Sequence, residues 1–310
     1  MKLAMVFPGQ GSQSVGMLKG YDGLPEIDST KKEAEAVLGA DFVEVMEHGP
    51  NEAINQTVNT QPAMVTAGYA VYRAWLASGG PKPEIVAGHS LGEYTALCAA
   101  GSLSFADALP LVRFRAQSMQ EAVPAGQGAM AAILNLTDEQ VIAACAEAGG
   151  VVQAVNFNSP SQVVIAGEKA AVERAIEKCK ALGAKRAMLL PVSAPFHSTL
   201  MAPAAQKLKV YLDKVALQQP KCAVVNNVDV SVETDPARIK DALVRQAASP
   251  VRWVETINRM LDMGATHIVE CGPGKVLAGL TKRIAPQVQS LSLSERASVE
   301  AALAAVKGAP

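Results

Sequence analysis

Ser90 lies in the pentapeptide Gly88-His89-Ser90-Leu91-Gly92, a G-x-S-x-G pattern between a predicted strand at 84–88 and a predicted helix at 91–100. A strand that turns sharply into a helix strains the serine backbone and presents its hydroxyl at the carboxyl end of the strand. The N–H of Leu91, at the helix start, points to where an oxyanion would form. The pattern predicts a nucleophilic serine; the alternative is a chance occurrence in an ordinary turn.

A nucleophilic serine needs a general base, and the chain has four histidines. His48 precedes Gly-Pro in a polar stretch that is typical of a surface, and His267 lies in a predicted buried strand. His89 is adjacent to Ser90, and neighbouring side chains at a strand end point apart. By elimination we expect His197 to be the base, since it lies in a loop and loops often carry catalytic groups.

The group that would orient this histidine is not evident from the sequence. An α/β-hydrolase carries serine, acid and histidine in that order along the chain. Glu270 ends a predicted strand, but it comes after His197. Either a neutral group orients the histidine, or the chain is not a standard hydrolase.

Arg115 lies in line with Ala108, Val112 and Met119 along a predicted helix at 105–122. A guanidinium within an apolar stripe is costly to bury unless it meets an anion. A carboxylate held by two parallel N–H bonds would suit it. Two interpretations stay open: a binding residue for a carboxylate, or a structural arginine that forms an ion pair or extends its guanidinium to solvent.

The glycine-rich segments do not fit nucleotide-binding motifs. In Gly9–Gly16 the third glycine is misplaced for G-x-G-x-x-G, and Gly272–Lys275 lacks the first P-loop glycine and the Ser/Thr after the lysine. The five cysteines form no C-x-x-C pair, which is typical of reduced thiols and not of a disulfide framework or a zinc site. We expect neither a cofactor nor a metal.

The composition is that of a compact enzyme: 49% of the 310 residues are hydrophobic and 18% are charged, with a net charge of −1. That balance excludes a protein that must neutralise many phosphates of a nucleic acid. The apolar run after Lys2 ends at Pro8-Gly9, too short for a signal-peptide core. No apolar stretch is long enough for a membrane span. We expect a soluble, cytoplasmic protein that binds neither nucleic acid nor membrane.

Strands and helices alternate along most of the chain, which predicts an α/β fold with a mainly parallel sheet. Between Pro124 and Pro191 the predicted order is β-α-β-β-α-β, the ferredoxin-like motif. The strands are expected at 128–134, 151–156, 161–166 and 185–190, and the helices at 138–148 and 168–182. We assign residues 125–194 to an inserted ferredoxin-like subdomain, and residues 1–124 and 195–310 to a larger catalytic subdomain.

Seven stretches, in order and from end to end of the chain, resemble malonyl-CoA:acyl carrier protein transacylases, an acyltransferase family of type II fatty acid synthesis. They are FPGQGSQ (7–13), GHSLGEY (88–94), RAQSMQEA (115–122), NFNSPSQVVIAG (156–167), PVSAPFHS (191–198), VRQAASPVRW (244–253) and ECGPGKVL (270–277). The resemblance implies an α/β-hydrolase-like large subdomain with a mainly parallel sheet beside the ferredoxin-like insert.

The resemblance also implies the catalytic roles. Ser90 matches the acylated nucleophile, and His197 matches its base. Gln10 and Leu91 match the positions whose backbone N–H groups form the oxyanion hole.

Three further positions concern the substrate and the histidine. Arg115 matches the arginine that binds the free carboxylate of malonyl. Gln246 matches a glutamine whose backbone carbonyl orients the histidine, so that the family works with a Ser-His dyad and Glu270 need not be recruited. Phe196 resembles the acyl-pocket aromatic of malonyl-selecting members, although here Pro195 precedes it.

The implied reaction moves a malonyl group from malonyl-CoA to the phosphopantetheine thiol of holo acyl carrier protein. It follows a ping-pong mechanism through a malonyl-Ser90 ester and supplies fatty acid elongation. We expect the protein to act as a monomer. The alternatives are a trans-acting acyltransferase of a polyketide pathway or of a malonate decarboxylase, a serine thioesterase or hydrolase, and a non-catalytic subunit that docks a carrier.

Overall fold

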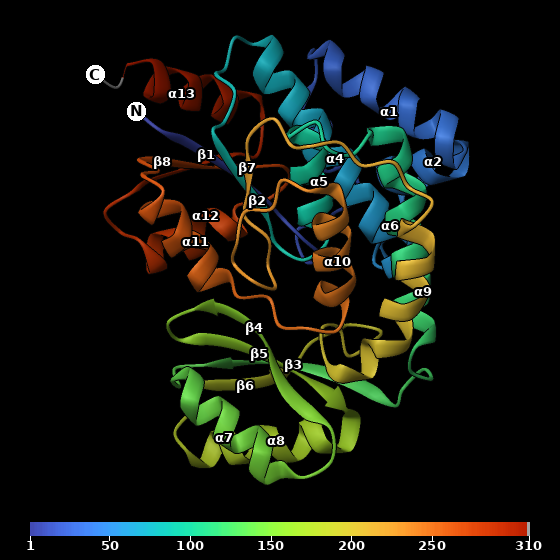
Figure 1. Ribbon diagram of the computed structural model, residues 1–310, viewed down its shortest axis with the longest axis vertical. Coiled ribbons are helices and arrows are strands. Elements are labelled where there is room, and N and C mark those ends of the chain that lie inside the picture. Colours follow the sequence, from blue (N-terminus) through green and yellow to red (C-terminus); the bar gives the residue numbers. More distant parts are fainter. Residues whose placement is uncertain (309–310) are drawn as a thin grey trace.

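A computed structural model describes residues 1–308 and shows two sheets with helices around them (Figure 1). The strands are β1 (Leu3–Phe7), β2 (Ile85–Gly88), β3 (Gly128–Leu134), β4 (Val152–Ser159), β5 (Gln162–Glu168), β6 (Arg186–Leu189), β7 (Ala223–Val224), β8 (His267–Cys271) and β9 (Gln289–Leu293). The α-helices are α1 (Pro25–Leu38), α2 (Ala40–His48), α3 (Asn51–Ile54), α4 (Thr57–Ala77), α5 (Gly92–Ala99), α6 (Phe105–Glu121), α7 (Asp138–Ala148), α8 (Lys169–Ala181), α9 (Ala202–Leu212), α10 (Pro236–Ala247), α11 (Trp253–Asp262), α12 (Val276–Ile284) and α13 (Arg296–Lys307). Across these residues, none of the helices combines the length and apolar content that a membrane span needs.

The larger sheet has five parallel strands in the order β7-β2-β1-β8-β9. Side chains of its central strand alternate between two hydrophobic cores: Leu3, Met5 and Phe7 belong to one, and Ala4 and Val6 to the other. Because successive side chains of a strand point to opposite faces, this sheet is buried on both sides. Helices α4 and α5 contribute to the first core, and α11 and α12 to the second. The predicted α/β fold with a mainly parallel sheet is confirmed.

The smaller sheet is antiparallel and has the order β4-β5-β3-β6. It forms a separate lobe with α7 and α8, which enclose a core of their own with one face of this sheet (Figure 1). The other face contributes Met130 and Val155 to the main core. The N–H of Val251 donates to the carbonyl of Val155 at 2.8 Å, and its carbonyl accepts from the N–H of Phe157 at 3.0 Å. Strand β4 is thereby tied to the segment between α10 and α11.

The strand and helices around Ser90 and Arg115 begin and end within one or two residues of their predicted positions. Strand β2 and helices α5 and α6 lie where the sequence predicts them, and the Ser104 hydroxyl caps α6 by accepting from the Asp107 N–H at 3.0 Å. The sequence pattern predicts a helix that follows Thr60 with Pro62 in its first turn, whereas helix α4 begins at Thr57 and has Pro62 in its second turn. The pattern also predicts a strand near 221–225, and β7, at the edge of the sheet, is shorter than that. Helices α1 to α3 occupy a stretch for which the sequence analysis assigned no element.

The turn between β2 and α5 is built on contacts that only glycine permits. A Cβ on Gly88 would lie 1.8 Å from the backbone carbon of Gly92, and a Cβ on Gly92 would lie 2.2 Å from the carbonyl oxygen of Phe7. Ser90, between the two glycines, has a φ of 53°. This is the left-handed region that non-glycine residues rarely adopt. The glycines therefore let β1, β2 and α5 approach closely enough to hold Ser90 in a strained turn.

We expect Gly92→Ala to destabilise the protein by about 3 kcal/mol or more, because its Cβ would meet backbone that cannot move aside. Gly279→Ala, within α12, is the matched control. Nothing lies within 4 Å of its added Cβ, so this variant should gain about 0.5–1 kcal/mol. Urea unfolding of both variants measures the difference. Equal stability of Gly92→Ala and the unsubstituted protein would contradict the packing argument.

Candidate active site

Loops at one edge of the larger sheet bring the predicted catalytic residues together. Gln10 follows β1, Ser90 follows β2, and Asn227 comes shortly after β7. The carboxyl ends of parallel strands meet at the same edge, where open α/β sheets bind ligands. Helix α10 carries Gln246 to this edge, next to α5 (Figure 1).

Ser90 and His197 form a hydrogen-bonded pair. The distance between Ser90 Oγ and His197 Nε2 is 2.7 Å. On the other side of the ring, His197 Nδ1 lies 3.0 Å from the main-chain oxygen of Gln246, where it can only act as the donor. The backbone of His197 is itself in the left-handed region, with a φ of 65°. This geometry holds the Nε2 lone pair toward the serine hydroxyl, as a general base requires.

The surroundings of His197 keep its imidazole neutral. The ring is buried, and burial together with the positive charge of Arg115 lowers the pKa of His197 to about 3. The hydrogen bond to Gln246 opposes this shift only in part. A neutral imidazole can accept the serine proton, so the base is ready at physiological pH.

Arg115 is a buried cation without a carboxylate partner in the described chain. Its Nη1 donates to Gln61 Oε1 at 2.7 Å, and its Nη2 donates to Gln246 Oε1 at 2.9 Å. The same Nη2 lies 3.3 Å from Ser90 Oγ, and within residues 1–308 Nε has no hydrogen-bond partner. Burial lowers the pKa of Arg115 from its ordinary value. The alternative of a structural ion pair is wrong, and the guanidinium can still receive an anion beside the nucleophile.

Asn227, which the sequence analysis missed, ties the nucleophile's turn to the neighbouring loop. Its Oδ1 accepts from the Ser90 N–H at 2.8 Å, and its Nδ2 donates to the carbonyl of Gly88 at 2.8 Å. One carboxamide thus satisfies backbone groups on both sides of the strained turn. A polar residue just beyond a strand at the same sheet edge is the signal that could have identified it.

Glu93 is a second residue that the sequence analysis missed. Its carboxylate is buried and accepts from the Asn227 N–H at 3.0 Å and from Gln246 Nε2 at 3.0 Å. Burial raises the pKa of Glu93 to about 7, against the opposing effect of these two hydrogen bonds. Glu93 is the sole charged residue of α5, whose other residues are uncharged and mostly apolar, and that isolation is the signal in the sequence.

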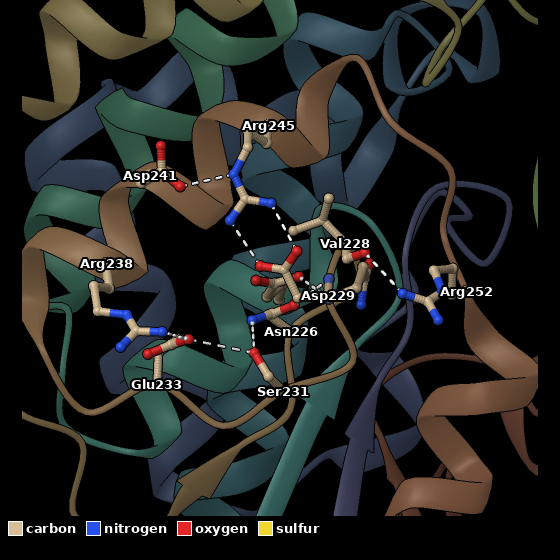
Figure 2. A network of polar contacts seen from close by, with 11 residues as sticks. Asn226, Val228, Asp229, Ser231, Glu233, Arg238, Asp241, Arg245 and Arg252 are labelled. Carbon is tan, nitrogen blue, oxygen red and sulfur yellow. Dashed lines mark hydrogen bonds and ion pairs between the residues drawn. The ribbon is translucent and has the colours of Figure 1, made fainter.

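An ion-pair network on the surface braces the segments that carry Asn227 and Gln246 (Figure 2). Arg245 binds Asp229 through two N–H bonds of 2.8 and 2.7 Å and also reaches Asp241 at 2.7 Å. The hydrogen bonds from Arg245 hold the pKa of Asp229 below its ordinary value. The bidentate pair joins the loop after β7 to the last turn of α10, next to Gln246.

A cavity of about 110 Å³ opens at the Ser90 hydroxyl, between the two lobes. Its lining comprises Gln10, Gln61, His89, Ser90, Leu91, Arg115, Met130, Asn156, Leu190, Val192, Phe196 and His197. The backbone amides of Gln10 and Leu91 donate to no other protein group within residues 1–308. The cavity therefore offers a nucleophile, a base, two free amides and a cation, with apolar side chains on the side of the smaller sheet.

All the predicted site residues lie at this cavity or directly behind it. Six line the cavity, and Gln246 is buried behind Arg115 and His197. A larger hollow of about 850 Å³ lies between α9 and α10, and its lining contains no serine, cysteine or histidine.

The other histidines and Glu270 do not contact Ser90 Oγ. His89 Nε2 lies 2.8 Å from Asn158 Oδ1, and its ring packs against Trp253. His48 is largely exposed and His267 is buried in β8, as predicted. Glu270 accepts from the Ala278 N–H at 2.7 Å, at the start of α12. Within residues 1–308, no cluster of His, Cys, Asp and Glu could hold a metal ion.

The chain matches the model of the acyl transferase domain over residues 4–299 and therefore belongs to the acyl transferase family. Malonyl CoA-acyl carrier protein transacylase of Salmonella typhimurium is 53% identical to it over 305 residues, which are 97% of this chain and 99% of the relative. The predicted resemblance to that group of acyltransferases is confirmed.

Solved structures agree with this assignment. The crystal structure of acyl-carrier-protein S-malonyltransferase from Burkholderia pseudomallei has a TM-score of 0.96 at 60% identity, over 98% of this chain and 99% of that one. The structure of a malonyl-transacylase in complex with its type II PKS acyl-carrier protein has a TM-score of 0.96 at 49% identity, with the same coverage.

The neutral state of His197 leads to a pH prediction. With p-nitrophenyl acetate, a neutral acyl donor, we expect the rate of Ser90 acylation to fall only below about pH 4, whereas an unperturbed histidine would halve it near pH 6.5. Rapid-quench mass spectrometry of the acetylated protein measures the rate. Glu93→Gln removes the carboxyl group behind the nucleophile, whose pKa burial raises to about 7. A midpoint near pH 6.5 that persists in Glu93→Gln would show that His197 titrates as an ordinary histidine.

Proposed function

We propose that this acyltransferase moves a malonyl group from malonyl-CoA to the phosphopantetheine thiol of holo acyl carrier protein, through a malonyl-Ser90 ester. The observation that carries the proposal is the buried, unpaired guanidinium of Arg115, 3.3 Å from Ser90 Oγ. A cation at that distance suits an acyl group that carries its own carboxylate. The solved relatives act on malonyl groups and acyl carrier protein by name.

In the first half-reaction, Ser90 Oγ attacks the thioester carbonyl of malonyl-CoA while His197 Nε2 takes its proton. The carbonyl oxygen becomes an oxyanion that accepts from the backbone N–H groups of Gln10 and Leu91. The carbon–sulfur bond then breaks, and His197 returns the proton to the departing CoA sulfur. The main-chain carbonyl of Gln246 stabilises the imidazolium that exists between the two proton transfers.

In the second half-reaction, the phosphopantetheine thiol of the carrier loses its proton to His197 and attacks the malonyl ester. The same two amides hold the second oxyanion. When the ester bond breaks, His197 protonates Ser90 Oγ, and the enzyme is ready for another malonyl-CoA. The first half-reaction passes one proton from the dyad to CoA, and the second returns one from the carrier thiol, so the complete cycle needs no further acid or base.

Arg115 selects the acyl group by charge. A malonyl carboxylate can accept from Nη2, the guanidinium nitrogen beside Ser90 Oγ, whereas an acetyl group leaves the buried cation unpaired. Leaving such a charge without a partner costs about 2–5 kcal/mol. Phe196, at the cavity wall, limits the room beside the acyl group and favours malonyl over branched relatives.

We further propose that residues 125–194 form a ferredoxin-like subdomain inserted in an α/β-hydrolase-like subdomain of residues 1–124 and 195–310. The separate sheet and separate core of β3 to β6, α7 and α8 support this division. The order β4-β5-β3-β6 with antiparallel pairing is the arrangement that a β-α-β-β-α-β chain adopts when each helix crosses to a strand two places away.

The proposal extends to the setting of the reaction. We place the enzyme in the cytoplasm, in fatty acid elongation, acting as a monomer without a cofactor. The free thiols of the described cysteines suit a reducing compartment.

The central experiment is intact-protein mass spectrometry after brief incubation with malonyl-CoA or acetyl-CoA, before and after addition of holo acyl carrier protein. We expect a malonyl adduct that Ser90→Ala abolishes and that moves to the carrier thiol. An adduct that decays to free malonate in the presence of the carrier would indicate a hydrolase. Absence of any adduct would indicate a non-catalytic docking subunit.

The same assay tests the role of Arg115. Arg115→Ala should lower the ratio of malonyl to acetyl acylation by at least about tenfold, which corresponds to 1.4 kcal/mol. Arg113→Ala is the matched control, since it removes an arginine from the same helix, where the guanidinium lies over the Phe42 ring and not at the cavity. An equal change of the ratio in both variants would refute the assignment.

A further inference from the structure

Glu93 is a buried carboxylate that the reaction as described does not use. It lies in the first turn of α5, 2% exposed, and forms no ion pair within the described residues. Burying an ionisable carboxyl without a cationic partner is costly. Its location behind the nucleophile indicates that it contributes to the site.

The carboxamide of Gln246 connects Glu93 to Arg115. Gln246 Nε2 donates to Glu93 Oε2 at 3.0 Å and to the main-chain oxygen of Ser90 at 2.9 Å, while its Oε1 accepts from Arg115 Nη2 at 2.9 Å. Turning the amide end for end would place its NH₂ against the guanidinium and its oxygen against two acceptors. The carboxylate of Glu93 therefore helps to determine which way the amide points, together with the main-chain oxygen of Ser90 and the guanidinium.

The orientation of this amide fixes the guanidinium. Gln246 Oε1 and Gln61 Oε1 hold the two terminal nitrogens of Arg115 and leave Nε free. The base does not depend on this side chain, because His197 Nδ1 bonds to the main-chain oxygen of Gln246. Gln246 thus positions Arg115 through its side chain and His197 through its main-chain oxygen.

We propose that Glu93 is a positioning residue for acyl selection, which acts through the Gln246 amide to hold Arg115 where it can grip the carboxylate of the acyl group. The inference rests on the proposed function and adds a residue to it. It predicts that loss of Glu93 harms the transfer of a carboxylate-bearing acyl group more than that of a neutral one. A purely structural Glu93, which only supports the turn through Asn227, would affect both acyl groups equally.

The test compares Ser90 acylation by malonyl-CoA and by acetyl-CoA in Glu93→Ala and Glu93→Gln, with rapid-quench mass spectrometry. A displacement of about 1 Å can cost up to a hundredfold in rate, so we expect Glu93→Ala to lower the malonyl-to-acetyl ratio by about ten- to a hundredfold. Glu93→Gln retains a carbonyl oxygen that can accept from both Asn227 and Gln246, and it should restore most of the ratio.

Glu270→Gln is the matched control, because Glu270 is also fully buried and accepts backbone N–H bonds, but at the start of α12. Its malonyl-to-acetyl ratio should equal that of the unsubstituted protein. If Glu93→Ala does not fold, Glu93→Asp carries the test, since it keeps the charge and withdraws the carboxylate from Gln246. The ratio should again fall.

Two outcomes would overturn the inference in distinguishable ways. In the first, the unsubstituted protein prefers malonyl and the Glu93 variants have the same malonyl-to-acetyl ratio. Glu93 would then have a structural role, and the proposed function would stand. An unsubstituted protein that takes no acyl group from either donor would overturn the proposed function, and the inference with it.

Discussion

A guanidinium buried without a carboxylate is the constraint on which the rest of the site depends. Water cannot solvate Arg115, so oxygen atoms of Gln61 and Gln246 take its place and satisfy the terminal nitrogens without cancelling the charge. Burial of the ring and the positive charge of Arg115 together lower the pKa of His197, and a neutral imidazole is the form that can accept a proton. The same cation that selects an acyl group thereby prepares the base.

The backbone carries strain at the two residues that react. Ser90 and His197 both have positive φ values, which cost energy in residues other than glycine and persist only where the surroundings hold them. Asn227 and the paired glycines hold the first, and the hydrogen bond to the main chain of Gln246 orients the ring of the second. Rigid support of this kind keeps the nucleophile and base aligned before substrate arrives.

Local patterns in the sequence predicted the local structure. The turn around Ser90 and the alternation of strands and helices depend on residues close together in the chain. The contacts of Gln246 with Ser90, Glu93 and Arg115 join residues more than 130 positions apart, and no spacing rule could reveal them; only the resemblance indicated Gln246. Helices α1 to α3 were missed because none of them begins with a side-chain cap that marks a helix start in the sequence.

Gln246 contacts His197 through its main chain and Arg115 through its side chain. This separation bears on how the acyl specificity of such an enzyme can change. A main-chain carbonyl is present whatever the side chain, so ordinary substitutions cannot remove the acceptor that orients His197. The amide that orients Arg115 is, by contrast, open to replacement. A lineage, or a protein engineer, could therefore alter the range of accepted acyl donors at positions 93, 115 and 246 while the machinery that makes and breaks the ester is inherited intact.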